Sequence, residues 1–346
     1  MNDAPDRPDL VIDGDSDDAL AVQWWGDPKG HPVVLMHGMP GSRIGPRPRG
    51  IVLERMGIRL ISYDRPGYGW SKRKQGRSVA QAAEDVERIA DRLKLQRFAV
   101  VGRSGGGPHA LACAALLDHL VERVALLVSF APPDALGLHW AEGMSPLNVD
   151  DYADIDESMA AAPAGHAADA ASLRERAEAM QTDPDALVRF LLPELTRADR
   201  RFVEDRAIRN LLSETYTEAV RQGADGWIDD AVALRNPWDF KFGDVRCPVL
   251  LWHGGEDRFA PASHTRWIAD ELRSYRETHE EREDVQVMIE RGAAHFAAFE
   301  VFTEVLSWLV APVVFPASSM ARTTVGPTDD GSVFRRAVPA HSGVPG

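Results

Sequence analysis

Short apolar runs alternate with helical patterns through most of the chain. Several runs are uninterrupted Val, Leu and Ile segments, which is typical of strands buried on both faces of a parallel sheet. Residues 78–93 instead place apolar side chains on one stripe and charged side chains opposite, which predicts an amphipathic helix. The alternation predicts a doubly wound α/β sheet. The predicted strands are 20–25, 33–37, 58–63, 98–102, 124–129, 248–253 and 285–290, and the other predicted helices are 108–120, 262–272 and 297–309.

One long stretch interrupts this alternation. Residues 132–239 contain no convincing strand pattern and are rich in Ala, Asp, Glu and Arg. The stretch lies between two predicted strands, so we expect a helical cap over the strand ends, inserted into a core made of residues 19–131 and 240–312. Helical spacing within it occurs at 168–180, 185–192 and 199–212.

Both ends of the chain differ from this core. Residues 1–18 are polar and rich in Asp, and we expect a flexible lead-in there. Residues 313–346 are rich in Ser, Thr, Pro and Gly and lack apolar periodicity, which predicts a disordered tail.

The charge balance limits the classes of partner. Lys and Arg number 39 against 53 Asp and Glu, so the formal net charge is −14. Such a chain repels phosphate backbones and anionic lipid, and neither nucleic acid nor a membrane is expected as a partner. The N-terminal residues lack the apolar segment of a secretory signal, and no apolar run approaches the length of a membrane span.

Two cysteines, Cys113 and Cys247, are present, and neither belongs to a CxxC pair. A disulfide scaffold and a cysteine-based zinc site are therefore not expected. No His and carboxylate spacing resembles a set of metal ligands, so we expect neither a metal nor a cofactor. Together these features favour a reduced, cytoplasmic protein; the oligomeric state cannot be predicted.

The strongest chemical signal is the G-x-S-x-G match at residues 102–106, with Ser104 at its centre. It follows a predicted strand and precedes an Ala- and Leu-rich helix, the context in which the pattern carries a nucleophile. The sharp turn requires neighbours without a Cβ, which Gly102 and Gly106 supply. The helix N-terminus below the turn offers N–H groups and positive potential to an oxyanion.

A second loop is expected to face this turn. The segment His37-Gly38-Met39-Pro40-Gly41 follows a predicted strand. The backbone N–H of Met39, paired with that of Gly105, would form a two-donor oxyanion hole. His37 is expected to be structural, as is the pair Asp64 and Arg65 in the tight loop at 63–71.

An acid and a base follow later in the chain. Asp257 lies in the turn after a predicted strand, where it can orient a histidine, and we favour it over Asp134; the adjacent Glu256 points elsewhere. His295 follows the last predicted strand, from which it can reach back to Ser104. The chain order is then nucleophile, acid, base. Imidazole near pKa 6.5 can accept the serine proton and return it to a leaving group.

These motifs in this order resemble the α/β-hydrolase superfamily, from about residue 20 to 312, and are similar to cap-bearing bacterial serine hydrolases with an S-G-G-G-P stretch. The resemblance implies an eight-stranded, mostly parallel sheet, a helical lid between strands six and seven, and acyl-enzyme chemistry. One residue departs from the family pattern: Ala294 stands where glycine usually precedes the histidine, which bears on the orientation of His295. The motifs are HGMPGS, DRPGYGWS, GRSGGG, WHGGEDRFAP and GAAHF.

The nucleophile limits the reaction. Haloalkane dehalogenases and epoxide hydrolases of this fold need a carboxylate where this chain has Ser104. Serine suits esters, thioesters, lactones, some amides and C–C bonds next to a ketone. We predict hydrolysis of a small or medium carboxylic ester or lactone, with a small acyl substrate as the partner. The alternatives are a proline-type aminopeptidase, a C–C hydrolase, an acyl transferase, a cofactor-free perhydrolase and a non-catalytic ligand-binding protein.

The substrate pocket is the least determined feature. Apolar pockets are usually lined by aromatic and aliphatic side chains. For each cap candidate the alternative is that it packs the cap onto the core. The cap candidates are Trp140, Met144, Trp227 and Trp238. His109, on the predicted helix after the nucleophile turn, is a further candidate, for which we favour packing.

Overall fold

The computed structural model describes residues 7–14, 16–161, 170–276 and 284–311. The predicted disordered tail at 313–346 lies outside these residues. The described residues belong to one compact unit that ends at Ala311.

An eight-stranded sheet forms the centre of this unit, in the order β1-β2-β4-β3-β5-β6-β7-β8. β1 pairs antiparallel with β2, and β2 pairs antiparallel with β4; every other pairing is parallel. The predicted mostly parallel, eight-stranded sheet is therefore confirmed. The strands are β1 (Leu10–Ile12), β2 (Leu20–Gly26), β3 (His31–Met36), β4 (Ile58–Tyr63), β5 (Phe98–Arg103), β6 (Val121–Leu127), β7 (Val249–Gly254) and β8 (Val285–Glu290).

Two strands differ from the prediction by more than two residues at one end or were not predicted at all. Residues 10–12, expected within a flexible lead-in, form β1 and pair with β2, with Leu10 opposite Val22. Ile12 is buried there, which gives this short segment an apolar anchor. β6 begins three residues earlier than predicted and ends at Leu127, because Val128 has a φ of +48° that no strand adopts.

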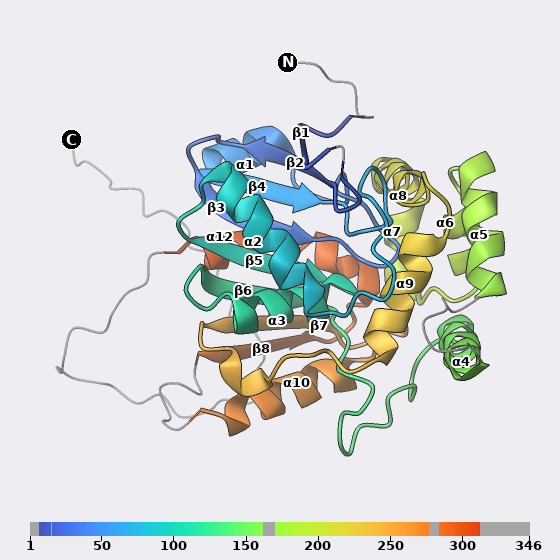
Figure 1. Cartoon of the computed structure of the whole chain (residues 1–346). Helices are drawn as coiled ribbons and strands as arrows, with labels where there is room; N and C mark the ends of the chain where they lie inside the picture. Colours follow the sequence, from blue (N-terminus) through green and yellow to red (C-terminus); the bar gives the residue numbers. More distant parts are fainter. Residues whose placement is uncertain (1–6, 15, 162–169, 277–283, 312–346) are drawn as a thin grey trace, which may run out of the picture. The chain divides into compact units, whose positions relative to one another are not determined.

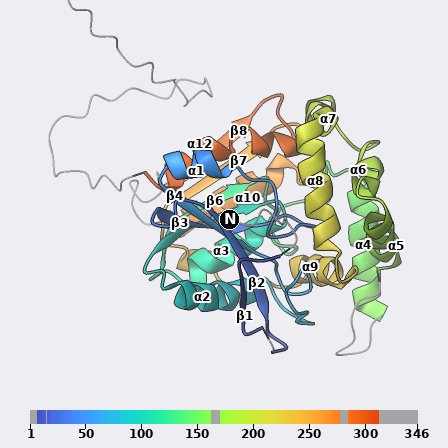
Figure 2. The same cartoon turned by 90° about the horizontal axis from the view of Figure 1, so that it is seen from above.

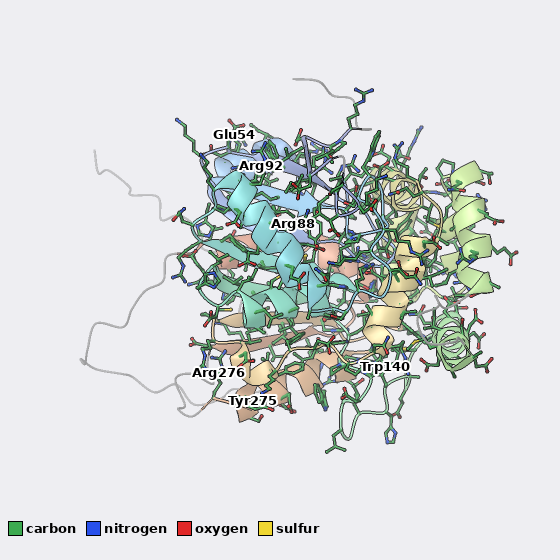
Figure 3. All side chains as sticks on the ribbon, viewed as in Figure 1. Glu54, Arg88, Arg92, Trp140, Tyr275 and Arg276 are labelled. Carbon is green, nitrogen blue, oxygen red and sulfur yellow. The ribbon has the colours of Figure 1, made fainter. Side chains whose placement is uncertain are left out.

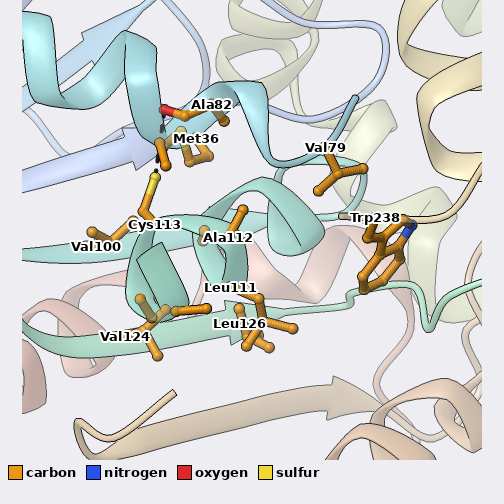
Figure 4. Packing of buried hydrophobic residues seen from close by; sticks show 14 of the residues in the cluster. Met36, Val79, Ala82, Val100, Leu111, Ala112, Cys113, Val124, Leu126 and Trp238 are labelled. Carbon is orange, nitrogen blue, oxygen red and sulfur yellow. Dashed lines mark hydrogen bonds between the residues drawn. The ribbon is translucent and has the colours of Figure 1, made fainter. Parts of the chain in front are cut away.

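Helices cover both faces of the sheet (Figure 2). α1 (Gly50–Arg55) and α12 (Phe302–Leu309) pack on one face, and α2 (Gln81–Leu93), α3 (Gly106–Leu116) and α10 (Ala262–Ser274) on the other. Successive residues of each central strand face opposite layers, so both layers are apolar. Figure 4 shows one layer, in which the Cys113 thiol donates to the Ala82 carbonyl oxygen at 3.6 Å.

The cap predicted after strand six is confirmed, because the described residues between β6 and β7 contain helices and no strand. Figure 1 shows these helices at the edge of the sheet toward which the strands point. The predicted helix 199–212 is two helices, because Asp205 is extended and its carboxylate accepts hydrogen bonds from the first N–H groups of the second helix. The cap helices are α4 (Pro146–Ala161), α5 (Ala171–Thr182), α6 (Ala186–Leu191), α7 (Arg197–Glu204), α8 (Arg206–Ala219) and α9 (Asp225–Arg235).

The last predicted helix is also divided. A short 3₁₀ helix, η2 (His295–Phe299), precedes α12, whereas the sequence predicts one helix over 297–309. A second 3₁₀ segment, η1 (Phe242–Asp244), leads from the cap back into the core. The loops after the carboxyl ends of β5, β7 and β8 carry Ser104, Asp257 and His295, and they lie at the edge of the sheet below the cap.

Candidate active site

Ser104 occupies the turn between β5 and α3 with a φ of +53°, a left-handed conformation that is uncommon for a residue with a side chain. The turn leaves no room for side chains on either side of it. A Cβ on Gly102 would lie 2.3 Å from the Gly106 carbonyl oxygen, and a Cβ on Gly106 would lie 2.3 Å from the Met36 carbonyl oxygen. Both positions therefore require glycine, as the sequence motif predicts.

Asp257 and His295 form a buried pair. His295 Nδ1 donates to Asp257 Oδ2 at 2.8 Å, while Oδ1 accepts from the N–H groups of Phe259 at 2.8 Å and Ala260 at 3.0 Å. Burial acts to raise the pKa of Asp257, but His295 and the nearby His253 hold this pKa well below its usual range. Asp134, the other acid considered, is exposed.

The loop that carries His295 is held by the cap. Asp199 of α7 is buried, and its Oδ1 accepts a hydrogen bond of 2.8 Å from the Phe296 N–H. Ala294, where glycine is usual, has a φ of −132°, which is extended backbone open to any residue. The departure from the family pattern therefore demands no special backbone at His295.

The peptide group before Met39 is fixed by the carbonyl oxygen of Gly38. That oxygen accepts hydrogen bonds from Arg65 Nη2 at 3.0 Å and from His37 Nδ1 at 2.8 Å. The C=O and N–H of a trans peptide point in opposite directions, so these bonds also fix the direction of the Met39 N–H.

The second candidate donor is fixed in the same way. The carbonyl oxygen of Ser104 accepts from the Gly107 N–H at 2.8 Å, which orients the N–H of Gly105 in the shared peptide. A Cβ on Gly105 would lie 2.7 Å from Met39 Cβ, so the two loops adjoin. Within the described ranges, neither N–H donates to a protein acceptor. Two preorganised donors are thus available to a ligand.

Behind these loops lies a group of buried charges, the Asp230 cluster, made of Asp230, Arg65, Arg77, Tyr68 and His109. Asp230, on cap helix α9, accepts from Arg65 Nε at 3.1 Å and from the Tyr68 hydroxyl at 2.9 Å, and it pairs with Arg77 at 2.5 Å. Burial acts to raise the pKa of Asp230, but Arg65 and Arg77 hold this pKa well below its usual range. The sequence predicts that Arg65 anchors its own loop but does not predict its partner Asp230, because no sequence motif marks that residue.

We expect Asp230→Asn to lower the free energy of unfolding by about 3–5 kcal/mol, because it leaves buried arginine charges unpaired. Urea unfolding at pH 7 measures the change. Asp225→Asn on the same helix is the control, because Asp225 pairs with arginines at a more exposed site, and its expected loss is below about 1 kcal/mol. Equal losses in the two variants would contradict the prediction.

The difference between wild type and Asp230→Asn also depends on pH. The folded-state pKa of Asp230 is depressed, so its stabilisation is complete above the unfolded-state pKa of about 3.9 and is lost as the pH falls toward the folded value. Repeating the unfolding at pH 3 should therefore give a smaller difference than at pH 7.

A cavity of about 90 Å³ opens beside Ser104 and is lined by both core and cap. Ser104, His295 and Met39 line it, and of the five pocket candidates Trp227 does so. Asp257 lies behind His295 and does not line the cavity. The structure therefore brings the predicted nucleophile, base and oxyanion loop to one cavity.

The other four pocket candidates do not line it, and each is a correction to the prediction. Trp140 (labelled in Figure 3) stacks on Phe130 and donates Nε1–H to the Ala131 carbonyl oxygen at 2.8 Å. Met144 is buried in the core. Trp238 packs in the core layer of Figure 4.

His109 is the fourth correction. Its Nδ1 donates to the Gly105 carbonyl oxygen at 2.7 Å, and its Nε2 lies 3.7 Å from Asp230. Burial and the charge of Arg65 lower its pKa to about 3, so the ring is uncharged at neutral pH. His109 thus packs behind the nucleophile turn, away from the cavity.

Sequence reasoning also missed polar residues that line the cavity. Arg103, Asp151, Arg176 and Tyr216 are among them. Arg103 has a readable signal, because it is a charge at the end of an otherwise apolar strand, directly before the nucleophile. The other three lie on cap helices, where charged and polar residues are common and carry no signal.

Comparison with known proteins agrees with this geometry. The family model described as alpha/beta hydrolase fold matches residues 31–301. The chain belongs to this family. The hydrolase is 31% identical over 243 residues to the 2-hydroxy-6-oxo-2,4-heptadienoate hydrolase of Pseudomonas putida, covering 67% of this chain and 74% of the relative.

Solved structures share the fold of this alpha/beta hydrolase. The enol-lactonase from Burkholderia xenovorans LB400 has a TM-score of 0.56 at 18% identity, covering 84% of this chain and 96% of that structure. An esterase from Exiguobacterium antarcticum has a TM-score of 0.57 at 22% identity, covering 85% and 96%. In the described part of this chain, no helix has the length and apolar character needed to cross a membrane.

Proposed function

We propose that this alpha/beta hydrolase is a serine hydrolase that cleaves a small or medium carboxylic ester or lactone through an acyl-enzyme on Ser104. One observation carries the proposal: the buried pair of Asp257 and His295, 2.8 Å apart, adjoins the cavity that Ser104 also lines. A serine turn alone is compatible with a purely structural role. A carboxylate held against a histidine at the same cavity supplies the proton transfer that makes serine a nucleophile.

In the first half of the reaction, Ser104 Oγ attacks the acyl carbon while its proton passes to His295 Nε2, since Nδ1 is engaged by Asp257. The carbonyl oxygen becomes an oxyanion, which the N–H groups of Met39 and Gly105 stabilise. When the intermediate collapses, the bond to the alcohol oxygen breaks and His295 returns the proton to that oxygen.

In the second half, water attacks the acyl carbon of the Ser104 ester and its proton passes to His295. Collapse breaks the bond to Ser104 Oγ, which recovers the proton, and the acid leaves. Asp257 stays ionised and favours the Nδ1–H tautomer through both halves, as its depressed pKa allows.

Cleavage of a C–C bond next to a ketone is a second candidate, favoured by the similarity to the Pseudomonas putida 2-hydroxy-6-oxo-2,4-heptadienoate hydrolase. The two reactions are separated by product analysis. Conversion of an oxo-dienoate faster than of any simple ester or lactone would favour the second candidate.

Intact mass measurement after treatment with a fluorophosphonate probe tests the proposal. We expect one adduct on the wild type and none on Ser104→Ala, because the probe reacts with an activated serine. An adduct on both proteins would place the reactive group elsewhere, and no adduct on folded wild type would contradict an activated Ser104.

A further inference from the structure

The charges that line the cavity do not balance. Arg176 and Asp151 both line it and pair with each other, with Arg176 Nη2 2.7 Å from Asp151 Oδ1. Arg103 also lines the cavity, and within the described part of the chain it forms no ion pair and no hydrogen bond. Asp257 and Asp199 act on the charge of Arg103 only from beyond ion-pair distance, and burial lowers the pKa of its guanidinium, so this cation has no anion in direct contact.

The position of Arg103 is fixed by aromatic rings and not by anions. Its guanidinium lies 4.2 Å from the centre of the Phe299 ring and 5.8 Å from that of Phe296. Such cation–π contacts hold the group in place while its N–H donors stay available. Its Nε is buried without a partner, so the chain itself leaves part of the fork unsatisfied.

Tyr216 of α8 adds a second polar group at the same place. Tyr216 lines the same cavity as Arg103, and burial raises the pKa of its phenol, so the hydroxyl group stays a neutral donor. No described residue forms a hydrogen bond with this hydroxyl group. A planar guanidinium and a hydroxyl together match the two oxygens of a carboxylate.

We propose that Arg103 and Tyr216 bind a free carboxylate on the acyl part of the substrate, so that the preferred substrates are half-esters of dicarboxylic acids or lactones that carry a carboxylate. This inference rests on the proposed function, because it places the carboxylate in the cavity beside Ser104. In this proposal Arg103 sets specificity, because its side chain lines the same cavity as Ser104.

Two methyl esters with acyl chains of equal length test the proposal. Monomethyl glutarate ends in a carboxylate where methyl pentanoate ends in a methyl group, and a pH-stat measures kcat/KM for both. We expect wild type to prefer monomethyl glutarate at least tenfold. Arg103→Met should lower the glutarate-to-pentanoate ratio by about 10- to 150-fold, the equivalent of a charged hydrogen bond of about 1.5–3 kcal/mol.

Matched variants isolate the effect. Arg103→Lys keeps the charge and should keep part of the preference, whereas Tyr216→Phe should lower the ratio a few-fold. Arg201→Met removes a positive charge from an exposed position on α7 and should change the ratio less than twofold, because water and salt screen that charge. Circular dichroism checks that each variant is folded.

Glutarate binding gives a readout that needs no turnover. Calorimetric titration of glutarate into Ser104→Ala should show binding that Arg103→Met in the same background loses. Binding that is unaffected by Arg103→Met, or an unchanged ratio of the two esters, would overturn the carboxylate site.

Failure of the two proposals is distinguishable. If neither ester is cleaved and no fluorophosphonate adduct forms, while glutarate binding still depends on Arg103, the carboxylate site stands and ester hydrolysis is wrong. If the adduct forms and both esters are cleaved equally well by wild type and Arg103→Met, ester hydrolysis stands and the carboxylate site is wrong.

Discussion

Ser104→Ala is expected to lower kcat/KM for methyl pentanoate by about 10⁵-fold or more, the scale seen when a triad nucleophile is removed. The proposed attacking oxygen is the one held at the turn between β5 and α3, next to the N–H groups of Met39 and Gly105. Initial rates at matched protein concentration measure the loss. The fold should survive, since alanine is smaller than serine and the turn already accepts a Cβ at this position.

Two further serine variants sharpen this test. Ser104→Gly also removes the hydroxyl but relieves the positive φ of +53°, so it should be equally inactive and somewhat more stable than Ser104→Ala. Ser307→Ala, at an exposed position on α12, should retain wild-type rates. Substantial turnover by Ser104→Ala, in a preparation free of wild type, would rule out the acyl-enzyme.

Asp257→Asn is expected to lower kcat by about 10⁴-fold while leaving the structure intact. An amide at this position can donate to His295 Nδ1, which favours the tautomer with the proton on Nε2. That tautomer cannot accept a proton from Ser104. Steady-state kinetics at pH 7.5 measures the effect, and the free energy of unfolding should change far less than the rate.

The neighbouring acids provide matched controls for this variant. Glu256 and Asp134 are both exposed, so Glu256→Gln and Asp134→Asn should leave kcat within about twofold of wild type, as surface changes usually do. A large loss in Asp134→Asn with full activity in Asp257→Asn would transfer the role of the acid to Asp134.

The sequence was sufficient to predict most of the sheet and the cap, because buried parallel strands are continuous apolar runs and their period is easy to read. β1 was missed because three residues in an Asp-rich segment carry too little pattern. The break at Asp205 was missed because the apolar spacing continues through it. An N-cap residue inside such spacing is recognised only when its side chain is seen to accept hydrogen bonds from backbone N–H groups.

The candidate site divides in the same way. Ser104, Asp257 and His295 were predictable because each lies in the loop that follows a parallel strand, and such loops gather at one edge of the sheet. The cavity walls were not, because a cap side chain faces the cavity or the core according to how helices pack. Trp227 and Trp238 are the same residue type and lie eleven residues apart in the chain, yet of these two only Trp227 lines the cavity. The contacts of Asp199 and Asp230 with the core were not predicted, because the cap sequence contains many acidic residues and no pattern distinguishes these two.

The ion pairs of α8 and α9 have a consequence for the construction of chimaeric enzymes. Asp230 pairs with Arg65, and Glu218 with Arg43, so both helices share buried charges with core loops. Replacing the whole insert with another cap would leave those two core arginines without their carboxylate partners. Asp199 of α7 also accepts a hydrogen bond from the core at Phe296, so an exchanged segment should end before Thr196, the N-cap of α7, and leave α7, α8 and α9 with their own core.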